Sequence, residues 1–211
     1  MKPKIIFTII LLNVSIYLIQ GQTVSELFIK LPEAAFLPLN VSDRSNLIAL
    51  YKAGEKATVK NRFDDSCSML RMTNDYLQIQ TGNNTVELFL LPMINDTKII
   101  GLIQTVCAPV CDSYLEFYTT AWKQLSASVF ITFAGKYDFL KDGINPEEEN
   151  IKNALIPLDI SLMQLNYDPD KQELLQYYTT PEYLSDTDRD KAIPYLKENP
   201  KRFKWNLTRF E

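Results

Sequence analysis

The sequence contains no histidine, and this absence excludes more chemistry than any other feature of its composition. Without histidine the chain cannot form a Ser–His or Cys–His nucleophile pair. It also lacks the commonest protein ligand for zinc, copper and non-haem iron. Any catalysis would have to rely on carboxylate, lysine, tyrosine or cysteine side chains, and we expect no metal and no other cofactor.

Cysteine is scarce, with three residues in all, so a chain that forms one internal disulfide leaves one thiol free. Cys107 and Cys111 flank an Ala-Pro-Val segment that we interpret as a hairpin tip. Residues that face each other before so short a loop can have Cβ atoms close enough to bridge, which makes this pair a candidate disulfide. A redox role is disfavoured, because the pair lacks the spacing and the helix N-terminus that lower a thiol pKa. Cys67 is expected to be a buried apolar residue.

Long apolar runs are absent after the first 21 residues. At the start, two lysines precede a mostly apolar stretch over residues 5–19, and Gly21 is a small residue suitable for cleavage. This pattern is typical of a secretory signal peptide over residues 1–21. An uncleaved anchor is disfavoured, because polar residues interrupt the run and it is short for a membrane span. We therefore expect a periplasmic or secreted protein with one domain over residues 22–211 and no stable membrane span after cleavage.

An excess of positive charge is also missing. The chain has 22 Lys and Arg against 26 Asp and Glu, a net charge of −4. Residues 1–21 contain two lysines and no acid, so their removal changes the net charge from −4 to −6. An acidic chain without a basic block lacks the electrostatic surface that nucleic acid requires, and nucleic acid is excluded as a partner.

The patterning of residues 22–120 predicts an α+β fold in which an antiparallel meander sheet packs against a few helices. Helices are predicted at residues 23–35, interrupted by Pro32, and at residues 40–53, capped by Ser42 or Asp43. Successive short turns rich in Asn, Asp and Gly favour hairpins over crossover helices. The strands between these turns are predicted at residues 68–72, 76–81, 85–91, 98–106 and 113–119.

The second half of the chain is less regular. A strand is predicted at residues 129–133. Residues 137–153 are charged and are predicted to be a surface connection with a short helix, which makes them a possible boundary between two halves. A helix is predicted at residues 181–198, with Pro194 dividing it into shorter pieces. Residues 201–211 are predicted to be a terminal strand or a segment that lies on the core.

One stretch of the sequence occurs twice. Residues 100–120 and 160–180 align without a gap and share eight identical residues in 21 positions. Each copy predicts a strand, a proline-containing turn and a return strand, and in the later copy these strands span residues 158–164 and 173–179. Two interpretations remain open. In one, the stretches are hairpins with a similar pattern within one sheet; in the other, they result from a duplication that gives two pseudo-repeated halves.

Aromatic residues around the repeated stretches are candidates for a binding surface. They could line a contact with a protein or a carbohydrate, although half-buried aromatics are also common in ordinary strands. The candidate residues are Tyr114, Tyr118, Trp122, Tyr178 and Tyr183.

Acidic clusters give weaker functional signals. The acids at residues 64–65 and 147–149 could supply the carboxylate pair of a glycosidase, but sequence alone brings no two of them to the required separation. The acids at residues 186, 188 and 190 alternate as in a calcium loop. An EF-hand would need Gly and Glu where Lys191 and Lys197 stand, so the pattern favours acids at a helix N-terminus.

The mature chain resembles a family of exported proteins from Gram-negative gut bacteria of the Bacteroidales type, catalogued as a domain of unknown function. The resemblance is clearest over residues 25–125 and is carried by the segments ELFIKLPEAAFLPLN, SDRSNLIALY, VELFLLPMI and CAPVCDSYLEFY. It implies export and an α+β domain. It supplies no catalytic or binding residue.

Three functional hypotheses follow. The first is an exported non-enzymatic binding protein of the cell envelope, with an unknown envelope protein or glycan as its partner. The second is a carboxylate-dependent hydrolase of glycans, which requires two acids about 5 to 10 Å apart in a cleft. The third is an enzyme-inhibitor-like module, which rests on architecture alone.

Overall fold

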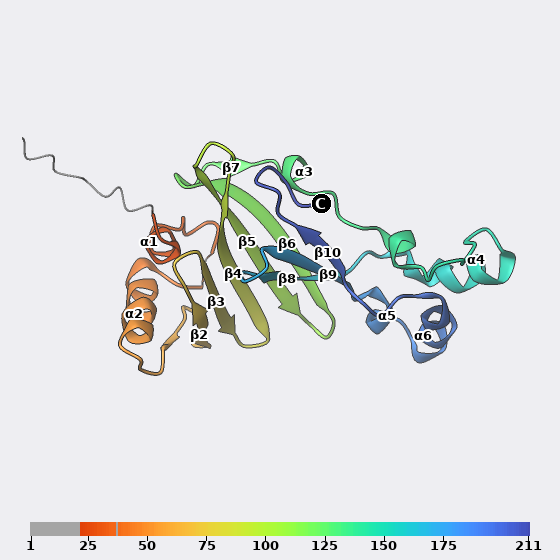
Figure 1. Ribbon diagram of the computed structural model, residues 1–211. Coiled ribbons are helices and arrows are strands. Elements are labelled where there is room, and N and C mark those ends of the chain that lie inside the picture. Colours follow the sequence, from red (N-terminus) through yellow and green to blue (C-terminus); the bar gives the residue numbers. More distant parts are fainter. Residues whose placement is uncertain (1–21, 37) are drawn as a thin grey trace, which may run out of the picture.

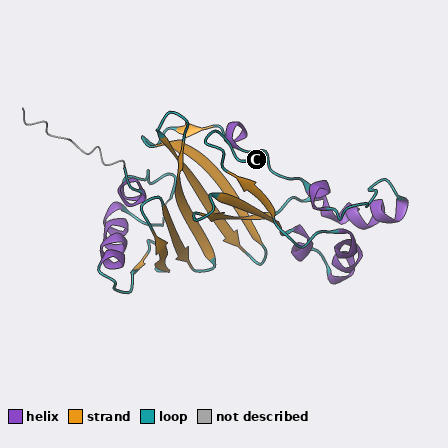
Figure 2. Ribbon diagram, in the orientation of Figure 1, coloured by secondary structure: helices purple, strands orange, loops and turns teal. Residues whose placement is uncertain are grey.

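The computed structural model describes residues 22–36 and 38–211, so the predicted signal peptide lies outside the described residues. Figure 1 shows a large sheet in the middle of the molecule, a smaller sheet against it, two helices at one end and a group of short helices at the other. Figure 2 shows the same division, with strands in the centre and helices mainly at the two ends. The predicted α+β class is confirmed.

Over the described residues, the large sheet has seven antiparallel strands whose spatial order is their order in the chain. The predicted meander is therefore confirmed. Glycine permits one of its tight turns, because Gly82 has a φ of 58° between the third and fourth strands. The strands are β1 (Thr58–Lys60), β2 (Ser66–Met72), β3 (Tyr76–Thr81), β4 (Asn84–Pro92), β5 (Lys98–Cys107), β6 (Cys111–Thr119) and β7 (Gln124–Leu125).

The large sheet is covered on much of both faces. Alternate residues of β4 show this, since Val86 and Leu88 belong to one hydrophobic cluster whereas Phe89 and Leu91 belong to another on the opposite face. A strand buried on both sides needs a nearly continuous apolar sequence, and β4 contains the run Leu88 to Leu91. Little of the sheet is therefore free to act as an open binding surface.

Two helices cover the first face, α1 (Val24–Ile29) and α2 (Val41–Lys52). Each begins with a capping box, in which Thr23 pairs with Glu26 and Asn40 pairs with Asp43. The predicted caps of the second helix were therefore wrong by a few residues, because the Asn40 side chain accepts the Asp43 backbone N–H at 2.9 Å. The first helix is shorter than predicted and ends before Pro32.

A three-stranded sheet covers the second face. It has the spatial order β10 (Lys201–Lys204), β9 (Glu173–Tyr178) and β8 (Met163–Asp168). The rings of Phe89 in the large sheet and Tyr167 in β8 are stacked, with centroids 4.0 Å apart. The end of the chain lies on the same core, where Trp205 and Phe210 are buried, so both parts of the prediction for residues 201–211 are confirmed.

A third, smaller hydrophobic cluster joins the short helices at the right of Figure 1. Residues 137–153, predicted to be a surface connection with a short helix, supply one 3-10 turn and one helix of this group, and the buried Ile151 anchors that helix. The predicted helix at residues 181–198 is divided into three short pieces. The elements of the group are η1 (Lys136–Phe139), α4 (Glu149–Leu155), η2 (Ile156–Asp159), α5 (Thr180–Tyr183), α6 (Asp186–Ala192) and η3 (Ile193–Tyr195).

Two strand predictions were wrong. Residues 129–133 were predicted as a strand, but the chain forms the short helix α3 (Ala127–Phe130) and then runs on without strand pairing. The Phe130 ring is buried against Phe117, so burial by a helical turn produced the apolar signal. Residues 158–162 were predicted to begin the strand 158–164, but β8 starts only at Met163. Pro157 lies in the first turn of the 3-10 helix η2, which extends to Asp159. The predicted alternation also fails, because Leu158 is buried whereas Ile160 is 48% exposed.

The repeated stretches both form hairpins but occupy different environments. In the first, Ile103 pairs with Leu115. In the second, the aligned residue Met163 pairs with Tyr178 and not with Leu175. The first hairpin lies inside the large sheet, and the second belongs to the small sheet. Matched residues therefore face different neighbours, and the prediction of two pseudo-repeated halves finds no support in the fold.

Candidate functional site

A cavity of about 320 Å³ lies where the end of β9 meets α5, α6 and the chain after η3. Its size is at the lower end of the range for small-molecule sites. The cavity forms because β9 ends at Tyr178 and Pro181 then starts a short helix, which turns the chain across the end of the small sheet. Ser185 caps the next helix by accepting the Asp188 backbone N–H, and this fixes the far wall.

Aromatic residues line part of the cavity. The rings of Tyr178 and Phe139 are stacked, with centroids 5.2 Å apart and planes inclined by 17°. Tyr177 lines the same cavity and is 36% exposed. Tyr177 and Tyr178 are adjacent on one strand, so their side chains leave it on opposite sides and the cavity lies around the strand end.

The Tyr178 hydroxyl is buried and has no hydrogen-bond partner among the described residues. The neighbouring Thr180 hydroxyl donates to the carbonyl oxygen of Ile160 at 3.0 Å. Burial raises the pKa of Tyr178, so the phenol keeps its proton at neutral pH. The hydroxyl lies beside the side chain of the fully buried Thr180, which does not line the cavity, so protein atoms enclose it and the Tyr178 ring is the part of this residue that a ligand could contact.

The polar lining of the cavity carries charges of both signs. Arg189 pairs with Asp186 at 2.8 Å and Lys197 pairs with Asp142 at 2.7 Å. The side chains of these two aspartates are 88% and 95% exposed, and such surface ion pairs hold their members only weakly. Two acids and two amides complete the lining, namely Glu182, Glu198, Gln164 and Asn199.

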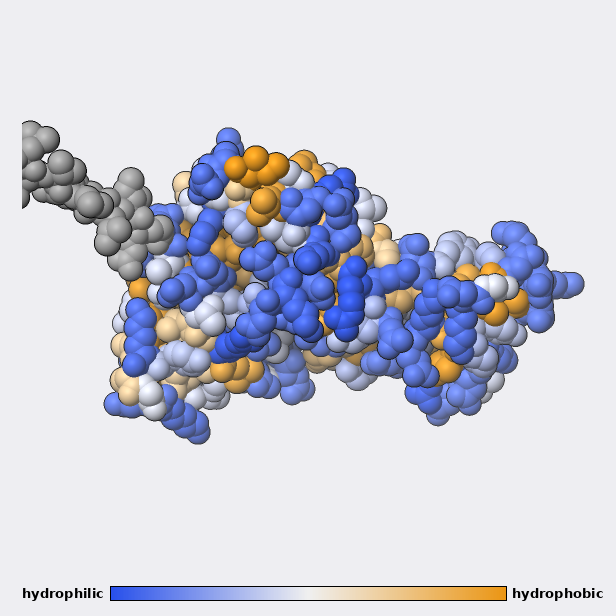
Figure 3. Space-filling model, viewed as in Figure 1, coloured by the Kyte–Doolittle hydropathy of each residue, from blue (hydrophilic) through white to orange (hydrophobic). Residues whose placement is uncertain are grey.

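The structure does not gather the predicted aromatic candidates on one surface. Tyr118 is buried, and its ring meets Trp122 edge-on at 5.3 Å beside the first core. Tyr114 is 62% exposed on β6, and Tyr183 is 55% exposed on α5 at the rim of a separate apolar groove. Only Tyr178 of the five lines the cavity. Figure 3 shows the viewed face as mostly hydrophilic, with small separate apolar patches.

The cysteines lie as follows. Cys107 and Cys111 are joined by a disulfide at the tip of the β5–β6 hairpin. Cys67 is a free thiol, fully buried in the first core, and burial raises its pKa. Neither site touches the cavity.

The predicted acidic clusters lie outside the cavity. Residues 64–65 precede β2 and residues 147–149 adjoin α4, at opposite ends of the molecule in Figure 1. Asp186 and Asp188 lie in the first turn of α6, as the helix N-terminus interpretation predicted. Within residues 22–36 and 38–211, no group of three or more metal-ligating side chains is placed to hold an ion.

Sequence analysis missed most of the cavity. It did not single out Phe139, Gln164, Tyr177 or Asn199, which come from four separate segments. The adjacent tyrosines at the end of β9 were the one available signal, because a Tyr–Tyr pair at a strand end places one ring on each side of the strand. The other residues reach the site only through tertiary folding.

The fold and the cavity together define an α+β protein with a preformed pocket between a small sheet and short helices. The chain belongs to the family described as "Protein of unknown function (DUF3256)", which matches residues 16–210. The predicted resemblance to a family of unknown function is thereby confirmed. No curated protein matches the chain.

The fold is similar to that of a solved structure. It is described as "Structure of a domain of an uncharacterized protein from Porphyromonas gingivalis W83", and the organism is a member of the Bacteroidales. It superposes with a TM-score of 0.80 at 23% identity, covering 90% of this chain and 98% of that one. At this identity the likeness shows the fold alone. In the part of the chain that the structure describes, no helix has both the length and the apolar character needed to cross a bilayer.

Proposed function

We propose that the protein is an exported, non-enzymatic binding protein of the cell envelope, periplasmic or secreted, that holds a segment of a neutral glycan in the cavity at the end of β9. The signal-peptide pattern of residues 1–21 supports export. The observation that carries the binding proposal is the cavity itself, which is lined by aromatic residues together with amide and charged side chains.

This combination of side chains suits a ligand that has both an apolar face and many hydroxyl groups. Aromatic rings bury apolar surface, and a hydroxyl can both donate to carboxylates and accept from cations and amides. The charged lining consists of Arg189 and Lys197 against Glu182 and Glu198, so neither sign is in excess. A strongly anionic or cationic ligand would find equal attraction and repulsion there, which favours an uncharged sugar.

We expect the mature protein to bind at least one of cellotetraose, chitotetraose and mannotetraose in calorimetric titrations. Replacing Tyr177 with alanine should weaken binding about tenfold, because an aromatic contact surface is lost. Tyr178→Leu should weaken binding about three- to tenfold, since it removes the ring that lines the cavity and keeps an apolar side chain.

The matched control is Tyr114→Ala, which removes an exposed tyrosine remote from the cavity. This variant should bind as the unmodified protein does. If all three variants lose affinity equally, or if the substitutions at Tyr177 and Tyr178 leave the affinity unchanged, the cavity is not the binding site.

A second candidate function is the glycan hydrolase, because the same cavity contains two carboxyl groups, Glu182 and Glu198. A hydrolase would release reducing ends from one of the three tetrasaccharides. Glu182→Gln and Glu198→Gln would each abolish that release while leaving binding intact. Binding without release supports the non-enzymatic proposal.

A further inference from the structure

The small sheet is attached to the large sheet through side-chain acceptors on the outer edge of β8. The backbone N–H groups on this edge point away from β9 and would otherwise be unpaired. Met163 donates to Asp112 at 3.1 Å and Leu165 donates to Ser113 at 2.9 Å. The third donor, Tyr167, bonds to a carboxylate oxygen of Glu87 at 3.1 Å.

Glu87 differs from the other two acceptors because it is both ionisable and buried. It is 2% exposed on β4, in the layer between the two sheets. Its Oε2 atom also accepts the Tyr76 hydroxyl at 2.9 Å. One carboxyl group therefore links three strands, β3, β4 and β8. Its pairing neighbours in the large sheet are the uncharged residues Gln78 and Ile103.

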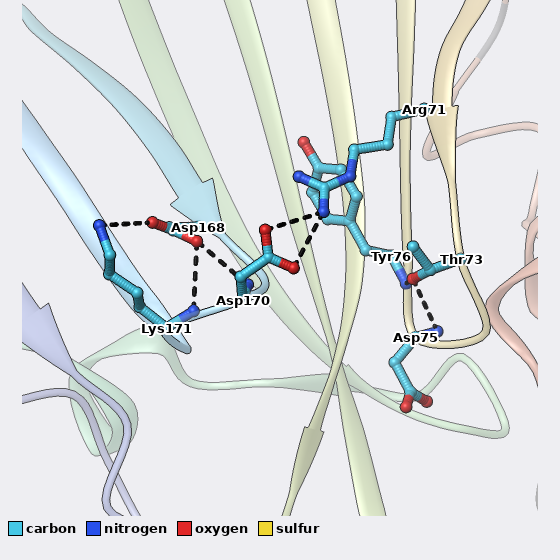
Figure 4. Close-up of polar contacts among 7 residues, drawn as sticks. All are labelled: Arg71, Thr73, Asp75, Tyr76, Asp168, Asp170 and Lys171. Carbon is cyan, nitrogen blue, oxygen red and sulfur yellow. Dashed lines mark hydrogen bonds and ion pairs between the residues drawn. The ribbon is translucent and has the colours of Figure 1, made fainter.

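The charged side chains nearest to Glu87 belong to the more exposed part of the junction between the two sheets, which Figure 4 draws. Arg71 lies over the Tyr76 ring, 5.6 Å from its centre, and pairs with both carboxylate oxygens of Asp170 at 3.0 Å. Asp168 on β8 is held by Lys171. The backbone N–H of Asp75, in the β2–β3 turn, bonds to the Thr73 hydroxyl in the same view. Arg71 and Lys171 pair with aspartates of this junction and Lys98 pairs with Asp75, so none of these cations within the described residues is free to neutralise an ionised Glu87.

We propose that Glu87 makes the attachment of the small sheet to the large sheet pH-sensitive. While its carboxyl is protonated the junction holds no buried charge; as it ionises, the uncompensated charge in that buried layer outweighs the stronger hydrogen bonds that a carboxylate accepts, and the attachment becomes less stable. The proposal concerns the attachment of the two sheets and does not depend on the ligand of the cavity.

Burial raises the pKa of Glu87 to about 7, and the hydrogen bonds from Tyr167 and Tyr76 oppose the shift only in part. Because the folded-state pKa lies above the unfolded value of 4.5, the folded state binds the proton more tightly. The stabilisation is complete below pH 4.5 and is lost as the pH rises through 7. Each unit of difference between the folded and unfolded pKa values changes the folding equilibrium constant tenfold. Over the full range, from below pH 4.5 to well above pH 7, the constant should therefore fall by more than about 100-fold.

The composition makes this effect unusually easy to isolate. Histidine is the side chain that normally titrates between pH 5 and 8, and this chain has none. Without a carboxyl group of raised pKa, the free energy of unfolding of a chain without histidine would change little between pH 5 and 8. A slope between pH 5.5 and 8.5 can therefore be assigned to Glu87 by a single substitution.

The test is urea unfolding of the mature protein between pH 5.5 and 8.5, together with carboxyl and amide NMR titration of the unmodified protein. The Glu87 carboxyl and the Tyr167 amide should titrate together with a midpoint near 7. The folding equilibrium constant of the unmodified protein should fall about 30-fold over the interval, whereas that of Glu87→Gln should stay constant.

Two control variants distinguish the loss of a hydrogen bond to β8 from the ionisation of Glu87. Ser113→Ala removes a non-titrating acceptor of the same edge and should lower stability equally at every pH. Glu147→Gln, an exposed acid, should keep the full slope. A Glu87 midpoint near 4.5, or equal slopes in the unmodified protein and Glu87→Gln, would overturn the proposal. If Glu87→Gln does not fold, the NMR midpoint alone decides.

Discussion

Replacing Arg44 with alanine should lower the free energy of unfolding by about 3 kcal/mol. Arg44 is fully buried on α2, and its guanidinium donates to the carbonyl oxygens of Phe28 and Leu31 at the end of α1. Its Nε also donates to the carbonyl oxygen of Asn40 at 3.3 Å. The carbonyls of Phe28 and Asn40 also accept backbone N–H groups, so the substitution leaves the buried Leu31 carbonyl without its donor and a cavity where the long side chain was.

The charge itself is not what stabilises the helix pair. Burial lowers the pKa of Arg44, yet a guanidinium stays protonated at neutral pH and its forked donors reach several acceptors at once. Arg44→Lys should therefore recover less than half of the loss, because one ammonium cannot span the same carbonyls. Arg62→Ala is the matched control, since that arginine pairs with Glu33 on the surface and should cost less than about 1 kcal/mol. Equal losses at both positions, in urea unfolding, would contradict this explanation.

Replacing Gly101 with alanine should cost about 2 to 3 kcal/mol through overpacking. Gly101 lies on β5 directly opposite Phe89, and a Cβ atom there would approach two ring carbons of Phe89 at 2.3 Å. The ring cannot move aside freely, because Tyr167 of the small sheet stacks on it at 4.0 Å. The absence of a side chain at Gly101 is what lets the two sheets meet at this point.

A double substitution tests the cause of that loss. Phe89→Leu frees space, so Gly101→Ala should cost less in that background, and the two effects should not be additive. Gly135→Ala is the control, because the nearest atom to its Cβ would be 3.9 Å away and the change should be close to neutral. Thermal unfolding of the four variants measures all of these differences. Strict additivity would show that the Phe89 ring is not the obstacle.

The meander was predictable because its information is local. Short turns rich in Asn, Asp and Gly specify hairpins, and consecutive hairpins specify an antiparallel sheet in chain order. The helix beginning near Asn40 was predictable for the same reason, although neighbouring residues compete for the cap. Asn40 is chosen because its backbone N–H and side chain both pair with Asp43, which sequence spacing alone does not distinguish from a cap at Ser42.

The second half was less predictable because tertiary packing decides its local structure. The alternation of Leu158, Ile160 and Leu162 matches a strand, yet Pro157 and the burial of Leu158 in the third cluster produce a 3-10 turn. The pairing of β10 with β9 joins residues about 30 positions apart, and no local pattern specifies it. The similarity of the two repeated stretches reflects hairpin patterning and does not determine their neighbours.

The candidate site was the least predictable part. Its aromatic lining combines Phe139 with Tyr177 and Tyr178, and its polar residues come from segments that meet only after the short helices pack together. Glu87 gave no signal either, since a single acid inside an apolar strand resembles a solvent-facing residue of an alternating strand. Its burial follows from the small sheet, which the sequence did not reveal.

The central functional claim is that the cavity at the end of β9 binds a neutral glycan. The most direct measurement is an NMR titration of the isotope-labelled mature protein with cellotetraose, chitotetraose and mannotetraose in turn. The account predicts that at least one of these sugars shifts the amide signals of Gln164, Tyr177, Tyr178 and Asn199 and leaves those of Tyr114 and of Val106 in the separate groove in place. Shifts that cluster around Val106, or no shift with any of the three sugars at millimolar concentration, would contradict it.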